Sequence, residues 1–312
     1  MPLHPDLEAF LDLVNAANAD GPALHELSAE QARAAYDRST RALDLPGPDL
    51  PCEALTLPAR DGHALPARLY RGDTAPRAPV LLFFHGGGYV LGGLDSHDSL
   101  CRDLARRAAC AVFAVDYRRA PEYRFPTAFH DAEDAAAWLR AHAVALGLDP
   151  ARIAVGGDSV GGTLATALTL AAREASLAQP VLQLLLYPCT SAHQDTPSHR
   201  RLATGHLLEQ RNLQWMFGQY LRGDADRLDW RFAPLQATSL QGLAPAHLAL
   251  AEFDPLLDEG LAYARALEAA GVRTRVQVYA GMVHDFARLG NVVEDAATLR
   301  ADAAAALAHA FR

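Results

Sequence analysis

Hydrophobic and polar positions follow two different patterns along the chain, and the change between them falls near residue 53. Before it, apolar residues recur at three- and four-residue intervals over residues 6–18, as on one face of a helix. A second helix is expected to begin at Ser28, because Gln31 completes a capping-box pattern there. After residue 53, short apolar runs typical of buried strands alternate with helical segments.

The alternating part of the chain predicts an α/β fold. Strands are expected at residues 53–59, 67–71, 79–85, 110–117, 152–158, 181–188, 246–254 and 273–281, and helices at 99–109, 129–143, 160–175, 258–271 and 291–310. Several of these strands are apolar throughout, as strands covered on both faces are. The pattern therefore predicts a central, mostly parallel sheet of about eight strands with helices on both faces.

One region interrupts this alternation. Residues 188–245 contain an amphipathic helix over 207–221 and no clear strand, so they are expected to form an insertion between a strand and the helix that follows it. The length of 312 residues fits one large domain, or one domain with a sizeable insertion. The helices that precede the first strand could then pack over a core formed by later residues.

Composition excludes several classes of function. The net charge of −9 makes a nucleic-acid partner unexpected. All 28 basic residues are arginine, which excludes both a Schiff-base lysine and the lysine of a phosphate-binding loop. The four cysteines lack the close spacing of a zinc site. No apolar run reaches membrane-spanning length and no signal peptide is recognised, so we expect a cytoplasmic protein with reduced cysteines.

A glycine-rich stretch follows the strand expected at 152–158, and it reads Gly157-Asp158-Ser159-Val160-Gly161. This G-x-S-x-G pattern, with a strand before it and a helix after it, predicts a nucleophilic serine on a tight turn. The glycines would let the strand and helix backbones approach closely, and the helix N-terminus would favour negative charge beside the hydroxyl. A glycine-rich turn with a capping serine is the alternative interpretation.

A second motif, His85-Gly86-Gly87-Gly88, follows the strand expected at 79–85. Acyl transfer needs two or three N–H groups aimed at one oxygen, and consecutive glycines let the backbone turn its N–H groups inward. The N–H of Val160, the residue after the serine, would supply a further donor. His85 is expected to brace this loop. A flexible surface loop is the alternative, although the order of the two motifs favours an oxyanion hole.

A serine nucleophile needs a base, and His284 is the best placed of the 13 histidines. It follows the strand at 273–281 by a short loop, which places it at the carboxyl edge of the sheet, where sites lie in this class of fold. His247 begins a strand and should lie at the opposite edge. We therefore predict that His284 is the base.

The base needs a carboxylate that holds its tautomer, and Asp254 is predicted to be that group because it closes the strand at 246–254. Glu252 lies inside the same strand, and Asp258 is expected to cap the following helix. The order of serine, aspartate and histidine along the chain is that of α/β hydrolases.

Five stretches taken together carry a resemblance to a known family, and they run from about residue 80 to 287. They are FFHGGGYVLGGLDSHD, VDYRRAPEYRFPTAFHD, GGDSVGG, FDPLLDEG with YARALEAAGV, and YAGMVHDF. Their order and spacing resemble those of the hormone-sensitive-lipase-like carboxylesterases of the α/β-hydrolase fold. The resemblance implies a triad of Ser159, Asp254 and His284, and an oxyanion hole formed by Gly87, Gly88 and the N–H of Val160.

The same resemblance divides the chain into a catalytic domain over residues 51–312 and a helical cap formed by residues 1–50 and about 190–230. It also makes pairing into a homodimer plausible. Two residues depart from the family pattern: Val160 stands where alanine is usual and Thr163 where asparagine is frequent. The extra bulk of Val160 is expected to narrow the acyl pocket.

The expected function is a serine carboxylesterase that cleaves small esters with short to medium acyl chains through an acyl-enzyme, without metal or organic cofactor. An amidase or a deacetylase of a small acylated compound is the near alternative. A non-catalytic small-molecule receptor is the alternative from another class, and the intact set of Ser159, Asp254 and His284 argues against it.

Overall fold

The computed structural model describes residues 2–19, 21–72 and 75–312. Within them, eight strands form one sheet in the order β1-β2-β4-β3-β5-β6-β7-β8. Their bounds are β1 Cys52–Pro58, β2 Ala64–Arg71, β3 Ala78–Phe84, β4 Ala111–Val115, β5 Leu148–Asp158, β6 Gln183–Leu186, β7 Ala246–Phe253 and β8 Thr274–Val283. β2 is antiparallel to β1 and β4, and all other neighbours are parallel. The predicted α/β fold with a mostly parallel sheet is confirmed.

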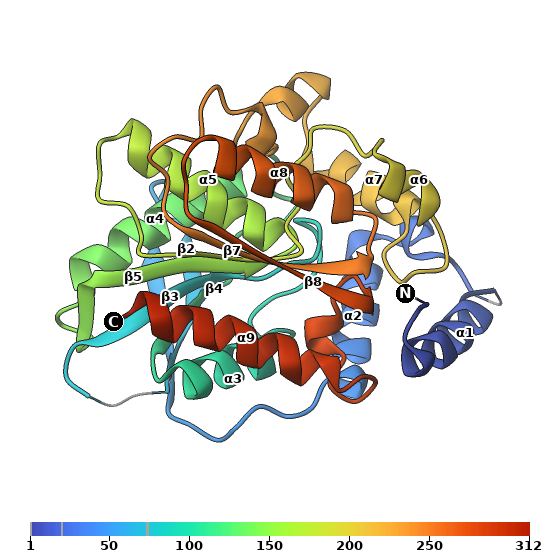
Figure 1. Ribbon diagram of the computed structural model, residues 1–312, viewed down its shortest axis with the longest axis horizontal. Helices are drawn as coiled ribbons and strands as arrows, with labels where there is room; N and C mark the ends of the chain where they lie inside the picture. Colours follow the sequence, from blue (N-terminus) through green and yellow to red (C-terminus); the bar gives the residue numbers. More distant parts are fainter. Residues whose placement is uncertain (1, 20, 73–74) are drawn as a thin grey trace.

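Helices cover both faces of the sheet (Figure 1). One face carries α4 (Thr127–His142), α5 (Val160–Glu174) and α8 (Leu257–Ala269), and the other carries α3 (Asp98–Ala108) and α9 (Asp295–Ala310). Side chains of β3 alternate between the two cores: Leu82 and Phe84 belong to one, and Leu81 and Phe83 to the other. The continuous apolar run of this strand therefore reflects burial on both faces.

Several element boundaries differ from the sequence-based prediction, and for two of them the structure shows contacts with distant parts of the chain. β5 begins at Leu148, four residues earlier than expected, because Leu148 pairs with Ala78 at the start of β3. α9 begins at Asp295 rather than at 291. The backbone N–H of Asn291 instead donates to the carbonyl of Leu43 (3.0 Å), at the end of a leading helix.

The leading helices are α1 (Pro5–Ala19) and α2 (Ala29–Leu43), with the short 3-10 helix η1 (Leu24–Glu26) between them. The predicted capping box is present: the Ser28 hydroxyl accepts from the N–H of Gln31 (3.2 Å), and the Gln31 side chain accepts from the N–H of Ser28 (3.0 Å). α1 buries Leu7 and Leu11 in the core on the α9 side of the sheet. The leading helices are thus joined to the core of the α/β fold.

The insertion over residues 188–245 contains α6 (Pro197–Arg201), α7 (Gln210–Tyr220) and the 3-10 helices η2 (Asp224–Leu228) and η3 (Pro234–Gln236), and no strand, as predicted. A further 3-10 helix, η4 (Phe286–Arg288), follows β8. Figure 1 shows α6 and α7 at the same end of the sheet as α2. The insertion and the leading helices therefore gather over one end of the sheet.

The prediction that Asp258 caps α8 is wrong. The residue that precedes this helix is Leu256, and its N–H donates to Oδ1 of Asp254 at 2.8 Å. Asp258 lies inside the first turn, and its carboxylate accepts from the backbone N–H of Ser198 in α6 (2.7 Å). Asp258 therefore connects α8 to the insertion, a contact between residues 60 positions apart.

Candidate active site

Ser159 occupies the tight turn between β5 and α5 that its motif predicted. Its backbone angles are φ 52° and ψ −123°, a conformation that residues other than glycine rarely adopt. The flanking glycines are required sterically, because a Cβ on Gly161 would lie 2.0 Å from the carbonyl oxygen of Phe84 and one on Gly157 would lie 2.3 Å from it. Ser159 thus has a strained backbone at the point where α5 packs closely against β3.

His284 and Asp254 meet at the carboxyl edge of the sheet, just beyond β8 and β7. Nδ1 of His284 lies 2.7 Å from Oδ2 of Asp254, and both side chains are buried. An ionised carboxylate only accepts hydrogen bonds, so Nδ1 carries the proton and Nε2 is left as an acceptor. Burial alone would lower the pKa of His284, but the charge of Asp254 and its hydrogen bond outweigh burial and raise it above 6.5.

The other candidates lie elsewhere. Glu252 accepts the backbone N–H of Gly281 at 2.8 Å, whereas the carboxylate beside His284 is that of Asp254. His247 sits at the start of β7, at the far end of the strand from Asp254, as expected. Its ring is buried, and neither of its nitrogens has a hydrogen-bond partner in the described part of the chain.

The glycine loop after β3 turns with positive φ at Gly87 (105°) and Gly88 (61°). Their N–H groups make no hydrogen bond within residues 2–19, 21–72 and 75–312 and are free to bind a ligand. The N–H of Val160 belongs to the first turn of α5, where backbone donors lack helical partners. The backbone N–H of Gly86, in contrast, donates to Oδ1 of Asp158 at 2.9 Å and fixes the start of the loop.

His85, which the sequence analysis expects to brace this loop, contacts its backbone. Its Nδ1 lies 2.8 Å from the carbonyl oxygen of Gly86, and its ring stacks on Tyr117 with 4.3 Å between centroids. The Tyr117 hydroxyl in turn donates to the carbonyl of His85 (2.8 Å). These contacts connect the ring and the backbone of His85 to the start of the glycine loop and to Tyr117.

Asp158 contacts a histidine that the sequence analysis did not predict as its partner. Nε2 of the buried His97 lies 3.2 Å from its carboxylate. Burial alone would raise the pKa of Asp158, but the charge and hydrogen bond of His97 and the charge of Arg288 outweigh burial and lower it to about 2. His97 precedes α3 and lies 61 positions from Asp158. The only sequence signal for its role is therefore its place in LDSHD, the end of the first stretch that resembles the family.

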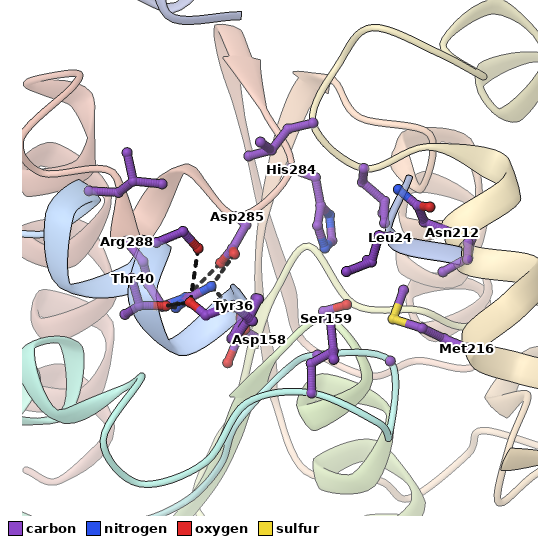
Figure 2. A pocket seen from close by; sticks show the side chains of 18 of the residues that line it. Leu24, Tyr36, Thr40, Asp158, Ser159, Asn212, Met216, His284, Asp285 and Arg288 are labelled. Atoms are coloured by element: carbon purple, nitrogen blue, oxygen red, sulfur yellow. Dashed lines mark hydrogen bonds and ion pairs between the residues drawn. The ribbon is translucent and has the colours of Figure 1, made fainter. Parts of the chain in front are cut away.

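A cavity of about 180 Å³ opens in front of Ser159 and His284. Figure 2 shows the His284 ring pointing toward the Ser159 hydroxyl, with Met216 and Leu24 on one side and Arg288, Tyr36 and Thr40 on the other. The lining residues are Leu24, Tyr36, Ser39, Thr40, Leu43, Gly87, Gly88, Leu91, Asp158, Ser159, Leu207, Leu208, Asn212, Leu213, Met216, His284, Asp285, Arg288 and Leu289. The cavity thus has a polar wall, with Arg288, Tyr36 and Thr40, and a mainly apolar wall that also contains Asn212.

The leading helices and the insertion supply much of this lining. From α7, Leu213 and Met216 face the cavity, whereas Tyr220 stacks on Tyr89 in the core with 3.9 Å between ring centroids. A Cβ on Gly88 would lie 2.2 Å from Sδ of Met216, so the methionine sits directly against the glycine loop. Val160 is buried outside the cavity lining, which gives no support to the expectation that it narrows the pocket.

Comparison with known proteins agrees with this fold. A family model described as the alpha/beta hydrolase fold matches residues 81–288. The ethyl acetate hydrolase of Pseudomonas putida is 49% identical over 304 residues, which cover 95% of each chain. Carboxylesterase NlhH of Mycobacterium tuberculosis is 37% identical over 269 residues, 85% of this chain and 84% of its own.

Two solved structures superpose over nearly the whole chain. A thermostable esterase from Pseudomonas putida ECU1011 has a TM-score of 0.95 at 34% identity and covers 100% of this chain and 98% of its own. The ester hydrolase EH1AB1 from the metagenome of Lake Arreo, in complex with a derivative of bipyridine phosphonate, has a TM-score of 0.96 at 35% identity and covers 99% of each chain.

The fold and these relatives define an ester-cleaving α/β hydrolase. The chain belongs to the hormone-sensitive-lipase-like carboxylesterase family of that fold, and it is a carboxylic ester hydrolase. Among the residues that the structure describes, no helix combines the length and the apolar character needed to cross a membrane.

Proposed function

We propose that Ser159 is the nucleophile of a serine carboxylesterase, with His284 as its base and Asp254 as the group that orients the base. The hydrogen bond between His284 and Asp254 carries this proposal, because it leaves Nε2 as the proton acceptor on the side of the cavity that Ser159 lines. Ser159 Oγ attacks the ester carbonyl carbon while Nε2 takes the hydroxyl proton. The charge that develops on the imidazolium is stabilised by the Asp254 carboxylate.

The tetrahedral oxyanion binds to the N–H groups of Gly87, Gly88 and Val160. The unpaired state of the two glycine N–H groups supports this role, and so does the position of Val160 at the N-terminus of α5. Nε2 then returns its proton to the leaving alcohol as the C–O bond breaks and the acyl-enzyme forms. Water, deprotonated by the same nitrogen, attacks the acyl carbon and releases the acid and free Ser159.

The substrates are small esters with short to medium acyl chains. A cavity of about 180 Å³ supports this range, because typical pockets for drug-sized ligands measure roughly 300–1,000 Å³. The name of the ethyl acetate hydrolase points in the same direction. Residues 1–50 and about 190–230 act as a cap, since α2, η1 and α7 supply lining residues.

Two further properties belong to this proposal. The protein works in the cytoplasm, and the free, buried thiols of Cys101 and Cys189 suit a reducing compartment. It pairs into a homodimer through the edge strand β8, on which Val278 is 40% exposed.

Covalent labelling tests the assignment of the nucleophile. A p-nitrophenyl alkylphosphonate should inactivate the enzyme with one equivalent bound, and mass spectrometry should locate the adduct on Ser159. Ser159→Ala should fold normally and lose turnover of p-nitrophenyl acetate by roughly three or more orders of magnitude. Ser191→Ala, which changes a hydroxyl outside the cavity lining, serves as the control. An adduct on another serine, or full turnover by Ser159→Ala, would contradict the assignment.

A further inference from the structure

Arg288 forms the back of the polar wall of the cavity, and its guanidinium is fully paired. Nε donates to Oδ1 of Asp285 (2.9 Å), and Nη1 donates to the carbonyl of Ser96 and the hydroxyl of Thr40 (both 3.1 Å). Nη2 donates to Oδ2 of Asp285 and to the hydroxyl of Tyr36. These acceptors match the five N–H donors of an arginine, so Arg288 has none left for a ligand.

Tyr36 differs from Arg288 because the proton of its hydroxyl is not used in a hydrogen bond. Its hydroxyl oxygen accepts from Arg288, so its single proton must be donated to another group. The hydroxyl donates no hydrogen bond to any group in the described part of the chain, and the side chain lines the cavity (Figure 2). The hydroxyl of Tyr36 is therefore a donor available to whatever occupies the cavity.

The neighbouring hydroxyls of α2 do not share this property. The Ser39 hydroxyl donates to the backbone carbonyl of Tyr36 at 2.8 Å, and the Thr40 hydroxyl donates to the same carbonyl at 3.0 Å. Both protons are thus used within the helix, although both residues line the cavity. Thr40 resembles Tyr36 in accepting from Arg288 and differs from it in having no proton left to donate.

The surroundings of Tyr36 hold this donor in place and strengthen it. The Arg288 guanidinium lies 4.9 Å from the centre of the Tyr36 ring as well as donating to its oxygen. A hydroxyl that accepts from a cation becomes a stronger donor, because hydrogen bonds in a chain polarise one another. Figure 2 shows Leu24, Met216 and Asn212 on the opposite side of the cavity, where Oδ1 of Asn212 lies 3.1 Å from Nδ1 of His25.

We propose that Tyr36 determines specificity by donating a hydrogen bond to an acceptor oxygen on the substrate, remote from the reacting carbonyl. The preferred esters then carry an ether, keto or hydroxyl oxygen in the acyl or the alcohol part, in addition to the ester group. This inference rests on the proposed function, because it takes the cavity in front of Ser159 as the substrate site.

Pairs of isosteric esters test the proposal in two arms. One arm compares p-nitrophenyl methoxyacetate with p-nitrophenyl butyrate, and the other compares 2-methoxyethyl acetate with butyl acetate. In each arm the ratio of the two kcat/KM values is measured for wild type and for Tyr36→Phe. Because the intrinsic reactivity of each ester is the same for both enzymes, it cancels when their ratios are compared. The arm that responds identifies the part of the substrate that carries the acceptor.

The expected result is a fall in the ether-to-alkyl ratio of roughly five- to tenfold in one arm for Tyr36→Phe, the scale of one neutral hydrogen bond. Thr40→Val is the matched control, since it also removes an acceptor of Arg288 but no available donor, and its ratios should equal those of wild type. Unchanged ratios for Tyr36→Phe in both arms would overturn the proposal. If Thr40→Val changes the ratios equally, the effect comes from the position of Arg288, and the proposal is again overturned.

Two further outcomes are decisive. Tyr36→Phe should cleave the alkyl esters within about tenfold of the wild-type rate, because those esters offer no acceptor to the hydroxyl. A variant without any turnover would contradict a role limited to specificity. Ser159→Ala, assayed on the same esters, separates this inference from the proposed function: if it retains turnover, the assignment of the nucleophile fails first.

Discussion

Nδ1 of His284 lies 2.7 Å from Oδ2 of Asp254, and this contact joins the ends of two neighbouring parallel strands 30 residues apart in the chain. The second oxygen of Asp254 accepts the N–H of Leu256 at 2.8 Å. The backbone two residues further on therefore orients the Asp254 carboxylate, which in turn orients His284. Both strand ends lie at one edge of the sheet because β7 and β8 run parallel.

Asp254→Asn should keep the fold and lower kcat by up to about 10⁴-fold, because the amide stabilises the wrong tautomer of the base. Circular dichroism and steady-state kinetics on p-nitrophenyl acetate measure the two effects. Glu252→Gln, which changes the neighbouring acid of the same strand, should retain most of the activity. A collapse in Glu252→Gln with an active Asp254→Asn would reverse the assignment of the carboxylate.

Activity should fall as the pH decreases through a value above 6.5. His284 acts as a base only when neutral, and Asp254 raises the pKa of its ring above the ordinary value despite burial. In Asp254→Asn the raising charge is absent, so the acid limb of kcat/KM should move to lower pH while the plateau falls. A pH series of kcat/KM for both enzymes measures the shift. An acid limb at the same pH in both would contradict the role of Asp254.

The sequence was sufficient for the features that local patterns encode. Strand and helix alternation predicted the sheet, and the strand-turn-helix context of Ser159 predicted its tight turn. The residues that the sequence missed act through distant contacts: His97 meets Asp158 across 61 positions, and Arg288 meets Tyr36 across 252. The spacing of residues along the chain carries no signal for such pairs. Asp258 was misassigned for the same reason, since its partner Ser198 comes from the insertion.

Stability should decrease in acid because of His247. Burial, with a further contribution from the charge of Arg275, lowers the pKa of this histidine to about 4, whereas an unfolded histidine titrates near 6.5. The unfolded state therefore binds the proton more tightly, and stability present above pH 6.5 is lost as the pH falls toward 4. The loss attributable to this group is about 3 kcal/mol.

His247→Phe removes this titrating group and should weaken the dependence of the free energy of unfolding on pH. The free energy of unfolding, measured by urea titration at pH 7.5 and at pH 4, should fall less in His247→Phe than in wild type. His193→Phe controls for the loss of a histidine, because His193 is exposed. Parallel curves for wild type and His247→Phe would show that other groups cause the acid sensitivity.

Met216 should limit the length of acyl chain that the enzyme accepts. Its side chain faces the cavity and lies against Gly88, one of the proposed oxyanion donors. Met216→Ala should extend the cavity and move the optimum of kcat/KM toward longer p-nitrophenyl esters. Each newly buried methylene contributes about 0.8 kcal/mol, or roughly fourfold in kcat/KM. Deleting the leading helices would be a poorer test, because it removes the buried Leu7 and Leu11 from the core.

Met216→Leu keeps the volume of the side chain and should keep the wild-type optimum. Trp215→Ala alters the same helix at a residue outside the cavity lining and controls for a general loosening of α7. Because truncating a buried methionine costs about 2–5 kcal/mol of stability, the assays belong below the melting temperature of the variant. An unchanged chain-length profile in a folded Met216→Ala, or the same shift in Trp215→Ala, would show that Met216 does not limit the acyl chain. The other apolar residues of the cavity would then set the limit.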